Sequence, residues 1–337
     1  MAAKLPLTIR LCRPRGFCAG VDRSIQIVVA ALKKYGSPVY VRHQIVHNRY
    51  VVQGLIARGA VFIEELIEIP HDKKDRPVIF SAHGVPRTVM EDAKNKKLFY
   101  IDATCPLVSK IHKQAIRHFR KERHVILIGH SGHPEVIGTM GQLSSENITL
   151  IETIEDALSY HPQDPSRLGF VTQTTLSLED TKSILHILKK RFPFIKAPAT
   201  ESICYATTNR QNVVKAAAPG SDLFLIVGAS NSSNSCRLVE VAQRAGASCA
   251  FLIQSPDEIN WRNLGPLRTV GLSAGASAPE IIVSDIIQAF IQRYNVSIEL
   301  QETVEEHQRF PIHRELSDVI LNKTEMAFVH GHEEHNL

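Results

Sequence analysis

Short apolar runs alternate with segments of helical periodicity along most of this 337-residue chain. The runs have the length of buried strands and cover residues 38–46, 76–84, 98–105, 124–132, 167–175, 223–230 and 269–277. Segments such as residues 181–192 and 280–294 place apolar residues three and four positions apart, as helices that pack one face on a sheet do. This alternation predicts an α/β fold of parallel sheets covered by helices.

Polar side chains collect where the predicted strands end. His47 and His83 end the first two strand regions, and His133 follows the run at 124–132. Thr174 lies in QTT at the end of a strand, and the sequences SNSSNS and GASAP follow the last two strands. Ligands of open parallel sheets bind beyond the carboxyl ends of the strands, so we expect a binding site there.

Three cysteines recur at equivalent points of this pattern. Cys18, Cys105 and Cys204 each come just before a helical segment, at intervals of 87 and 99 residues. Two polar strand ends separate each cysteine from the next, so the pattern repeats three times. We therefore expect three similar lobes in a pseudo-threefold trefoil that brings the thiols together.

The predicted boundaries follow from these cysteines. They are residues 19–105 for lobe 1, residues 106–203 for lobe 2, and residues 204–295 together with residues 1–18 for lobe 3. Residues 296–337 fall outside the repeat and are expected to form a flexible or peripheral C-terminal extension.

The spacing alone leaves open whether these thiols bind metal or pack in the core. A lone cysteine is most often a small buried hydrophobic residue, and we predict that role for Cys12, Cys236 and Cys249. No Cys-x-x-Cys pair occurs, which disfavours zinc-ribbon and thioredoxin-like sites. A disulfide framework is not expected, because a cytoplasmic chain keeps its cysteines reduced.

Composition and charge fit a globular cytoplasmic protein. Hydrophobic residues make up 44% of the chain, and its formal net charge is +5 with acidic residues interspersed throughout. This diffuse excess suits an anionic small molecule or an acidic protein partner, but not nucleic acid, which calls for a clustered basic face. The first residues lack the apolar region of a signal peptide, and no run approaches the roughly 18 apolar residues of a membrane span.

Three thiolates without a fourth suit a 4Fe–4S cluster with one iron left open. Such an iron could act as a Lewis acid on a substrate oxygen. The Ser/Asn run and GASAP place hydroxyls, amides and free N–H groups at strand-to-helix turns, where an anion such as phosphate is favoured. Histidines at neighbouring strand ends could donate hydrogen bonds to the same anion. Taken singly, each of these features also fits a solvated loop, a helix cap or a structural histidine.

The sequence as a whole resembles a known family. The segments that carry the resemblance run in order from about residue 8 to residue 290. They are PRGFCAGVDR, YVRHQIVHNRYVV, FSAHGV, DATCPLV, GHSGHPEVIGTMGQ, VTQTTLS, ICYATTNRQ, NSSNS and AGASAP. Together they closely resemble the LytB/IspH family of 4-hydroxy-3-methylbut-2-enyl diphosphate reductases.

The resemblance implies a trefoil of α/β lobes around one 4Fe–4S cluster per chain, and a role for each matching residue. Cys18, Cys105 and Cys204 would be the cluster ligands. Glu135 would deliver a proton, and Thr174 would support Glu135 and the substrate hydroxyl. The implied diphosphate pocket consists of His47, His83, His133, Ser232, Ser233, Asn234 and Ser277.

The implied reaction is reductive removal of the allylic hydroxyl, bound at the open iron, to give isopentenyl and dimethylallyl diphosphates. No G-x-G-x-x-G fingerprint for a dinucleotide occurs, so a separate ferredoxin or flavodoxin, with its reductase, is expected to supply electrons. Two alternatives remain open. One is an iron–sulfur hydro-lyase acting on a phosphorylated substrate, and the other is a non-catalytic iron–sulfur sensor.

Overall fold

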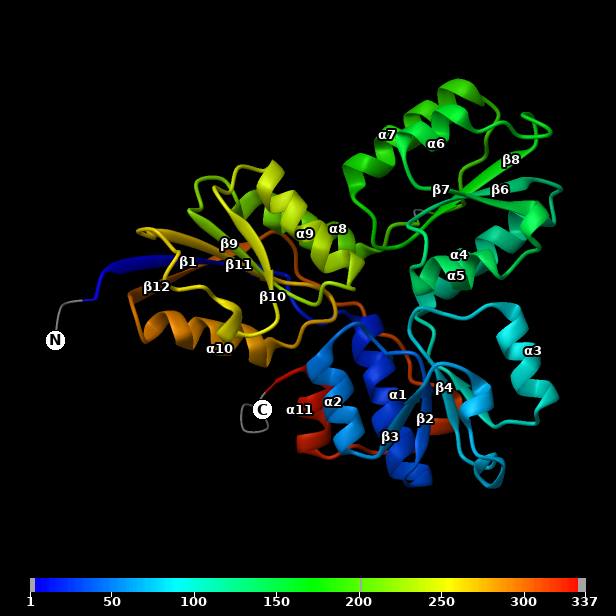
Figure 1. The fold of residues 1–337 in the computed structure, drawn as a ribbon, viewed down its shortest axis with the longest axis horizontal. Coiled ribbons are helices and arrows are strands. Elements are labelled where there is room, and N and C mark those ends of the chain that lie inside the picture. The colour runs from blue at the N-terminus through cyan, green and yellow to red at the C-terminus, as the bar shows by residue number, and fades with distance from the viewer. Residues whose placement is uncertain (1–3, 201, 333–337) are drawn as a thin grey trace.

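The computed structural model describes residues 4–200 and 202–332. Three separate sheets, each covered by helices, form three lobes that are arranged as a trefoil (Figure 1). The strand pairings are parallel throughout the described residues. This confirms the predicted fold class. None of the helices in the described ranges is long and apolar enough to cross a membrane.

The first sheet has the strand order β3-β2-β4-β5. Its strands are β2 (Val39–Arg42), β3 (Ala60–Ile63), β4 (Val78–Phe80) and β5 (Tyr100–Asp102). The helices beside it are α1 (Ala19–Tyr35), α2 (Arg49–Ala57) and α3 (Arg87–Asn95). Every residue of β2 and β4 is buried, because helices cover both faces of the sheet.

The second sheet has the order β7-β6-β8. Its strands are β6 (His124–Ile128), β7 (Ile148–Ile151) and β8 (Leu168–Thr172). Its helices are α4 (Pro106–Phe119), α5 (Pro134–Met140), α6 (Ile154–Ser159) and α7 (Leu178–Arg191).

The third sheet has the order β10-β9-β11-β1-β12 and includes the N-terminal strand of the described chain. Its strands are β1 (Pro6–Arg13), β9 (Leu223–Val227), β10 (Ala250–Ile253), β11 (Thr269–Ala274) and β12 (Asn295–Glu302). Its helices are α8 (Tyr205–Ala217), α9 (Ser233–Arg244) and α10 (Glu280–Ile291). The N-terminal strand β1 lies inside this sheet, between β11 and β12.

One three-strand unit occurs in all three sheets. The orders β3-β2-β4, β7-β6-β8 and β10-β9-β11 are the same when each is numbered from its own first strand. In each unit the first strand leads through a helix to an edge strand, and the chain then returns to the other side of the first strand. The loops that follow the first and third strands therefore leave each sheet at the same carboxyl end.

The edge strands of these units were not found from the sequence. β3, β7 and β10 have four residues each, and their middle residues are partly or fully exposed. Their sequences, AVFI, ITLI and AFLI, are apolar but too short for periodicity to identify them as strands. Every strand region predicted above does contain a strand.

The prediction of a flexible or peripheral extension at residues 296–337 is wrong for the part that the structure describes. β12 pairs with β1 over eight consecutive residues, from Asn295 opposite Pro6 to Glu302 opposite Arg13. Helix α11 (Lys323–His330) packs against α1 and buries Ala327, Phe328 and Val329. Since α11 has only eight residues, its apolar face gives too short a periodic pattern to predict a helix. The last residues of HGHEEHNL, 333–337, lie outside the described ranges.

Candidate active site

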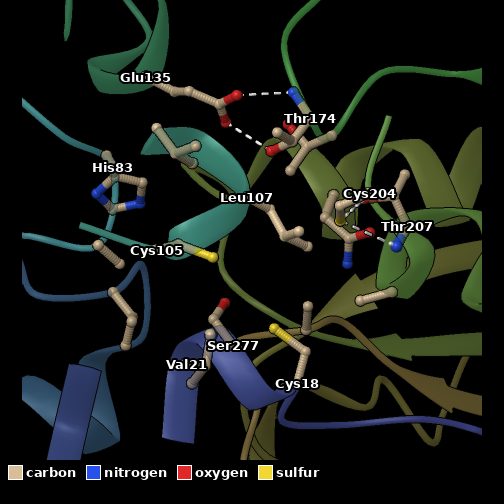
Figure 2. A pocket seen from close by; sticks show the side chains of 18 of the residues that line it. Cys18, Val21, His83, Cys105, Leu107, Glu135, Thr174, Cys204, Thr207 and Ser277 are labelled. Carbon is tan, nitrogen blue, oxygen red and sulfur yellow. Dashed lines mark hydrogen bonds between the residues drawn. The ribbon is translucent and has the colours of Figure 1, made fainter. Parts of the chain in front are cut away.

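Each of the three predicted ligand cysteines is the N-cap residue of a helix. Cys18 precedes α1, Cys105 precedes α4 and Cys204 precedes α8. All three side chains border one cavity (Figure 2). A helix N-terminus offers free N–H groups and the positive end of the helix dipole, both of which favour a thiolate. At Cys204 the Sγ accepts a hydrogen bond of 3.4 Å from the N–H of Thr207.

Burial keeps these thiols protonated as long as nothing cationic is bound. It raises the pKa of Cys105 to about 12, and the neighbouring Cys18 and Cys204 add to the rise. It raises the pKa of Cys204 to about 11, and it raises the pKa of Cys18 as well. Because metals bind thiolates, a metal group that enters the cavity must displace these protons.

The space between the thiols fits a cluster better than a single metal ion. Among the described residues, no three His, Cys, Asp or Glu side chains form a compact site for one ion. The cavity is kept open at Gly20, where a Cβ atom would lie 2.7 Å from the Cys105 Sγ and 3.8 Å from the Cys18 Sγ. Three half-buried thiols around such a space match the ligand set of a 4Fe–4S cluster with one open iron.

Three histidine rings meet at one side of the cavity. The rings of His47 and His83 stack with centroids 4.1 Å apart, and His133 stands edge-on to both, at 5.7 and 5.9 Å. Burial lowers the pKa of His47 and the pKa of His133 to about 4. Burial, with a further contribution from the other histidines, lowers the pKa of His83 well below its usual value. The rings are therefore neutral at pH 7 until an anion approaches.

These histidines keep hydrogen-bonding capacity for a ligand. The Nδ1 of His133 accepts the N–H of Glu135 at 3.1 Å, so its Nε2 carries the proton. The Nε2 of His47 is buried and has no partner. A buried polar atom without a partner costs free energy, and a bound acceptor would remove that cost.

The SNSSNS sequence forms another part of the cavity wall. Ser232 caps α9, and its Oγ accepts a hydrogen bond from the Ser235 hydroxyl at 2.9 Å. Both side-chain polar atoms of Asn234 are buried without a partner. Ser277 reaches in from the loop after β11 and donates a hydrogen bond of 3.1 Å to the carbonyl of His47. Free amide groups at the start of α9 make this side suitable for an anion.

A buried carboxyl group completes the cavity. Glu135, in the first turn of α5, is only 2% exposed. Its Oε1 accepts the N–H of Thr174 at 2.7 Å, and its Oε2 accepts the Thr174 hydroxyl at 2.8 Å (Figure 2). Burial raises the pKa of Glu135 to about 7, although the two hydrogen bonds from Thr174 oppose the rise. A carboxyl group with this pKa can hold a proton and release it near neutral pH.

All of the residues that the sequence singled out as site residues line this one cavity, which encloses about 780 Å³ including its mouth. The cysteines predicted for the core differ from one another. Cys12 is fully buried, Cys236 is half-buried, and Cys249 is exposed because it lies in the loop before β10. The core prediction is therefore confirmed for Cys12 and wrong for Cys249.

Sequence reasoning missed several residues that also line the cavity. Tyr205 and Thr207 lie in the first turn of α8, and Phe310 comes from the segment that was predicted to be peripheral. Gln173, next to Thr174, is 1% exposed and donates to Thr175 at 2.8 Å and to Ser233 at 3.3 Å, which links the second and third lobes. The position of Thr207 three residues after an N-cap cysteine could have revealed it, whereas nothing near Phe310 marks it as a site residue.

Comparison with known proteins agrees with this arrangement. The LytB protein family matches residues 9–291. The 4-hydroxy-3-methylbut-2-enyl diphosphate reductase of Bartonella tribocorum is 70% identical over 331 residues, which cover 98% of this chain and 94% of that protein. The reductase of the same name from Rhizobium etli is 65% identical over 331 residues, which cover 98% of this chain and 99% of that protein.

Solved structures give the same result. The E-1-hydroxy-2-methyl-but-2-enyl-4-diphosphate reductase from Plasmodium falciparum matches with a TM-score of 0.87 and 35% identity, over 93% of this chain and 97% of that one. A second solved structure, of (E)-4-hydroxy-3-methyl-but-2-enyl diphosphate reductase, matches with a TM-score of 0.60 and 32% identity, over 85% of this chain and 99% of that one.

Fold and cavity together define an α/β enzyme whose active site lies where three parallel-sheet lobes meet. Because the chain matches named reductases over nearly its whole length, this enzyme is an oxidoreductase. The chain belongs to the LytB protein family.

Proposed function

We propose that this cavity carries out the reductive dehydroxylation of (E)-4-hydroxy-3-methylbut-2-enyl diphosphate. The products would be isopentenyl and dimethylallyl diphosphates, in the last step of the non-mevalonate route to isoprenoid precursors. One observation carries the proposal: three thiols, an anion-binding rim and a buried carboxyl group with a pKa near 7 line the same cavity. A substrate with a diphosphate at one end and an allylic hydroxyl at the other needs each of these groups.

The diphosphate would bind between the histidines and the start of α9. The residues proposed for this role are His47, His83, His133, Ser232, Ser233, Asn234 and Ser277. The unpartnered polar atoms of Asn234 and His47 support the assignment, because a phosphate oxygen or a bound water would satisfy them. The negative ligand would also raise the depressed pKa of each ring, so protons would be taken up on binding.

Glu135 would hold the proton that the departing hydroxyl requires. Hydroxide is a poor leaving group, and a positioned acid that protonates it contributes roughly 10²–10⁴ in rate. Burial keeps much of the Glu135 population protonated near pH 7. Thr174 would orient both carboxyl oxygens through its N–H and its hydroxyl, and its Oγ could also contact the substrate hydroxyl.

Cys18, Cys105 and Cys204 would hold a 4Fe–4S cluster, one per chain. When bound, the cluster would supply electrons and an open, Lewis-acidic iron. The cavity wall near the thiols is largely apolar, with Val21, Leu107 and Phe310 among its residues. This wall would exclude water from the allyl part of the substrate and strengthen the hydrogen bonds made inside.

We also propose where the protein works and with which partners. A ferredoxin or flavodoxin, with its reductase, would supply electrons, and the mild positive net charge suits such acidic carriers. The cytoplasm is the proposed compartment, in agreement with six cysteines that remain free thiols. The proposed lobe boundaries are residues 19–105, residues 106–203, and residues 204–295 with residues 1–18, to which the pairing of β12 with β1 adds residues 296–302.

An anaerobic turnover assay tests the function. The protein is reconstituted with ferrous iron and sulfide, and the substrate is added with and without a reduced viologen dye. We expect two electrons to be consumed for each substrate molecule and both isoprenoid diphosphates to form. Consumption of substrate without reductant would instead indicate a hydro-lyase. No consumption by iron-loaded protein would indicate a sensor.

A further inference from the structure

Cys18 lies at the end of a loop that joins β1 to α1, and backbone contacts determine its position. The N–H of Gly16 donates to the carbonyl of Ala274 at 3.1 Å, and the N–H of Cys18 donates to that of Ala276 at 3.3 Å. Gly16 has a φ of +67°, a conformation that other residues rarely adopt. These contacts hold the N–H side of the loop, and its carbonyl groups need partners of their own.

Arg210 supplies those partners. Its Nε and Nη2 donate to the carbonyl of Gly16 at 3.1 and 2.7 Å, and Nη2 also donates to the carbonyl of Phe17 at 3.2 Å. The side chain is 0% exposed. The planar guanidinium fork thus holds the two carbonyl groups that immediately precede Cys18, in a geometry that a lysine cannot reproduce.

The same arginine belongs to α8, the helix that Cys204 caps. Six residues separate Cys204 from Arg210, which is about 9 Å along the helix axis. A single rigid helix therefore carries both a thiol of the cavity and the side chain that holds the loop of Cys18. We propose that Arg210 is a positioning residue that fixes Cys18 relative to Cys204, an inference that rests on the proposed function of these thiols.

Glu306 extends this arrangement to the C-terminal segment, defined as residues 303–322. Its Oε1 lies 3.0 Å from Nη1 of Arg210 and also accepts a hydrogen bond of 3.0 Å from Asn209. A buried guanidinium needs such a counter-charge, because an unpaired buried charge is strongly destabilising. Four residues later Phe310 lines the cavity. The C-terminal segment therefore supports the thiol site, through Glu306 and Arg210.

A purely structural ion pair is the competing explanation, and matched variants separate the two. Arg210→Gln removes the fork and the charge, whereas Arg210→Lys keeps the charge and loses the fork. Glu306→Gln leaves Arg210 in place without its counter-charge. The control is Glu325→Gln, which removes an ion pair of 2.7 Å with Lys33 between α11 and α1, away from the residues that line the cavity.

The test uses cluster-free, full-length protein whose fold is checked by circular dichroism and thermal unfolding. Iodoacetamide is added anaerobically at one pH, and peptide mass spectrometry measures the alkylation rates of Cys18 and Cys105. Arg210→Gln and Arg210→Lys are expected to raise the Cys18 to Cys105 rate ratio about tenfold, because hydrogen bonds from a charged donor restrain local opening. Glu306→Gln should raise it less, and Glu325→Gln should leave it unchanged.

Iron content after reconstitution gives a second measurement. Both Arg210 variants are expected to bind less iron than the parent and to show an altered cluster spectrum. A folded Arg210→Gln with a parental alkylation ratio and parental iron content would overturn the inference, as would full rescue by Arg210→Lys. Should neither Arg210 variant fold, an unchanged ratio in Glu306→Gln would overturn it equally. Failure of the parent to bind iron would instead refute the proposed cluster, and the alkylation ratios would still report on Arg210.

Discussion

Replacement of Glu135 by glutamine is the most informative single change, because it has one effect on catalysis and another on stability. Glutamine has nearly the same shape as glutamate. Its oxygen can accept the N–H of Thr174, and its NH₂ group can donate to the Thr174 hydroxyl once that hydroxyl turns round. The fold should therefore persist. The variant lacks an ionisable proton, so turnover should fall by roughly two to four orders of magnitude while iron content and substrate binding stay close to parental.

The effect on stability depends on pH. Burial raises the pKa of Glu135 from 4.5 to about 7, so between these values the unfolded chain releases a proton that the folded protein retains. The folded parent thus loses stability as the pH rises through this window, by up to about 3 kcal/mol from this one group. Glutamine avoids the loss. The free energy of unfolding of the variant should therefore rise relative to that of the parent as the pH increases from 4.5, and the difference should level off above pH 7.

Two measurements decide the matter. Urea unfolding of cluster-free protein at pH 5 and pH 8 gives the stability difference, and anaerobic turnover gives the catalytic effect. Glu146→Gln, at an exposed acid of the same lobe, serves as the control and should change neither. Near-parental turnover of Glu135→Gln would remove this residue as the proton source. A stability difference that does not vary with pH would show that the carboxyl pKa is not raised.

Three further results are expected. Serine at Cys18, Cys105 or Cys204 should abolish iron binding, measured by iron and sulfide analysis, whereas serine at Cys12, Cys236 or Cys249 should not; loss of iron only in the second group would refute the threefold arrangement. Alanine at both Ser232 and Asn234 should weaken diphosphate binding by roughly 10- to 150-fold per lost hydrogen bond, while the cluster absorbance stays unchanged. Diphosphate binding should take up protons and weaken as the pH rises from 5 to 8, because burial lowers the pKa of His47 and His133 to about 4 and that of His83 well below its usual value, and an anion raises each of them. Calorimetry in buffers of different ionisation enthalpy measures that uptake, and its absence would show that the rings stay neutral.

The fold class could be predicted because the central strands are uninterrupted apolar runs, as in LFLIV of β9, all of whose residues are buried. The residues of the candidate site could be predicted for a related reason. Apart from Cys204, which follows α7, they come in the loops or first helical turns after strands, and the topology brings all of these strand ends together. Local sequence pattern and three-dimensional position therefore agree at Glu135 and Ser277, far apart as they are in the chain.

Residues that depend on long-range packing could not be predicted. Phe310 lies in a polar stretch with no periodic pattern, and distant contacts, the pairing of β12 with β1 and the ion pair of Glu306 with Arg210, bring it to the cavity. Arg210 looks like a solvated helix residue in ATTNRQ, because nothing in the local sequence shows that Gly16 and Glu306 will surround it. Local patterns do not report which distant segment will cover a given helix face.

The insertion of β1 between β11 and β12 has a consequence for biosynthesis. Thr8 pairs with Thr269 on one side and with Ser297 on the other, so β1 leaves the ribosome long before the two strands that flank it. At typical translation rates the delay is roughly 10 to 50 seconds, during which the first two lobes can already fold. Cys18 cannot reach its final position until β11 has emerged. The proposed cluster can therefore be inserted only after residues 269–276 have been made, once the first two lobes have had time to fold.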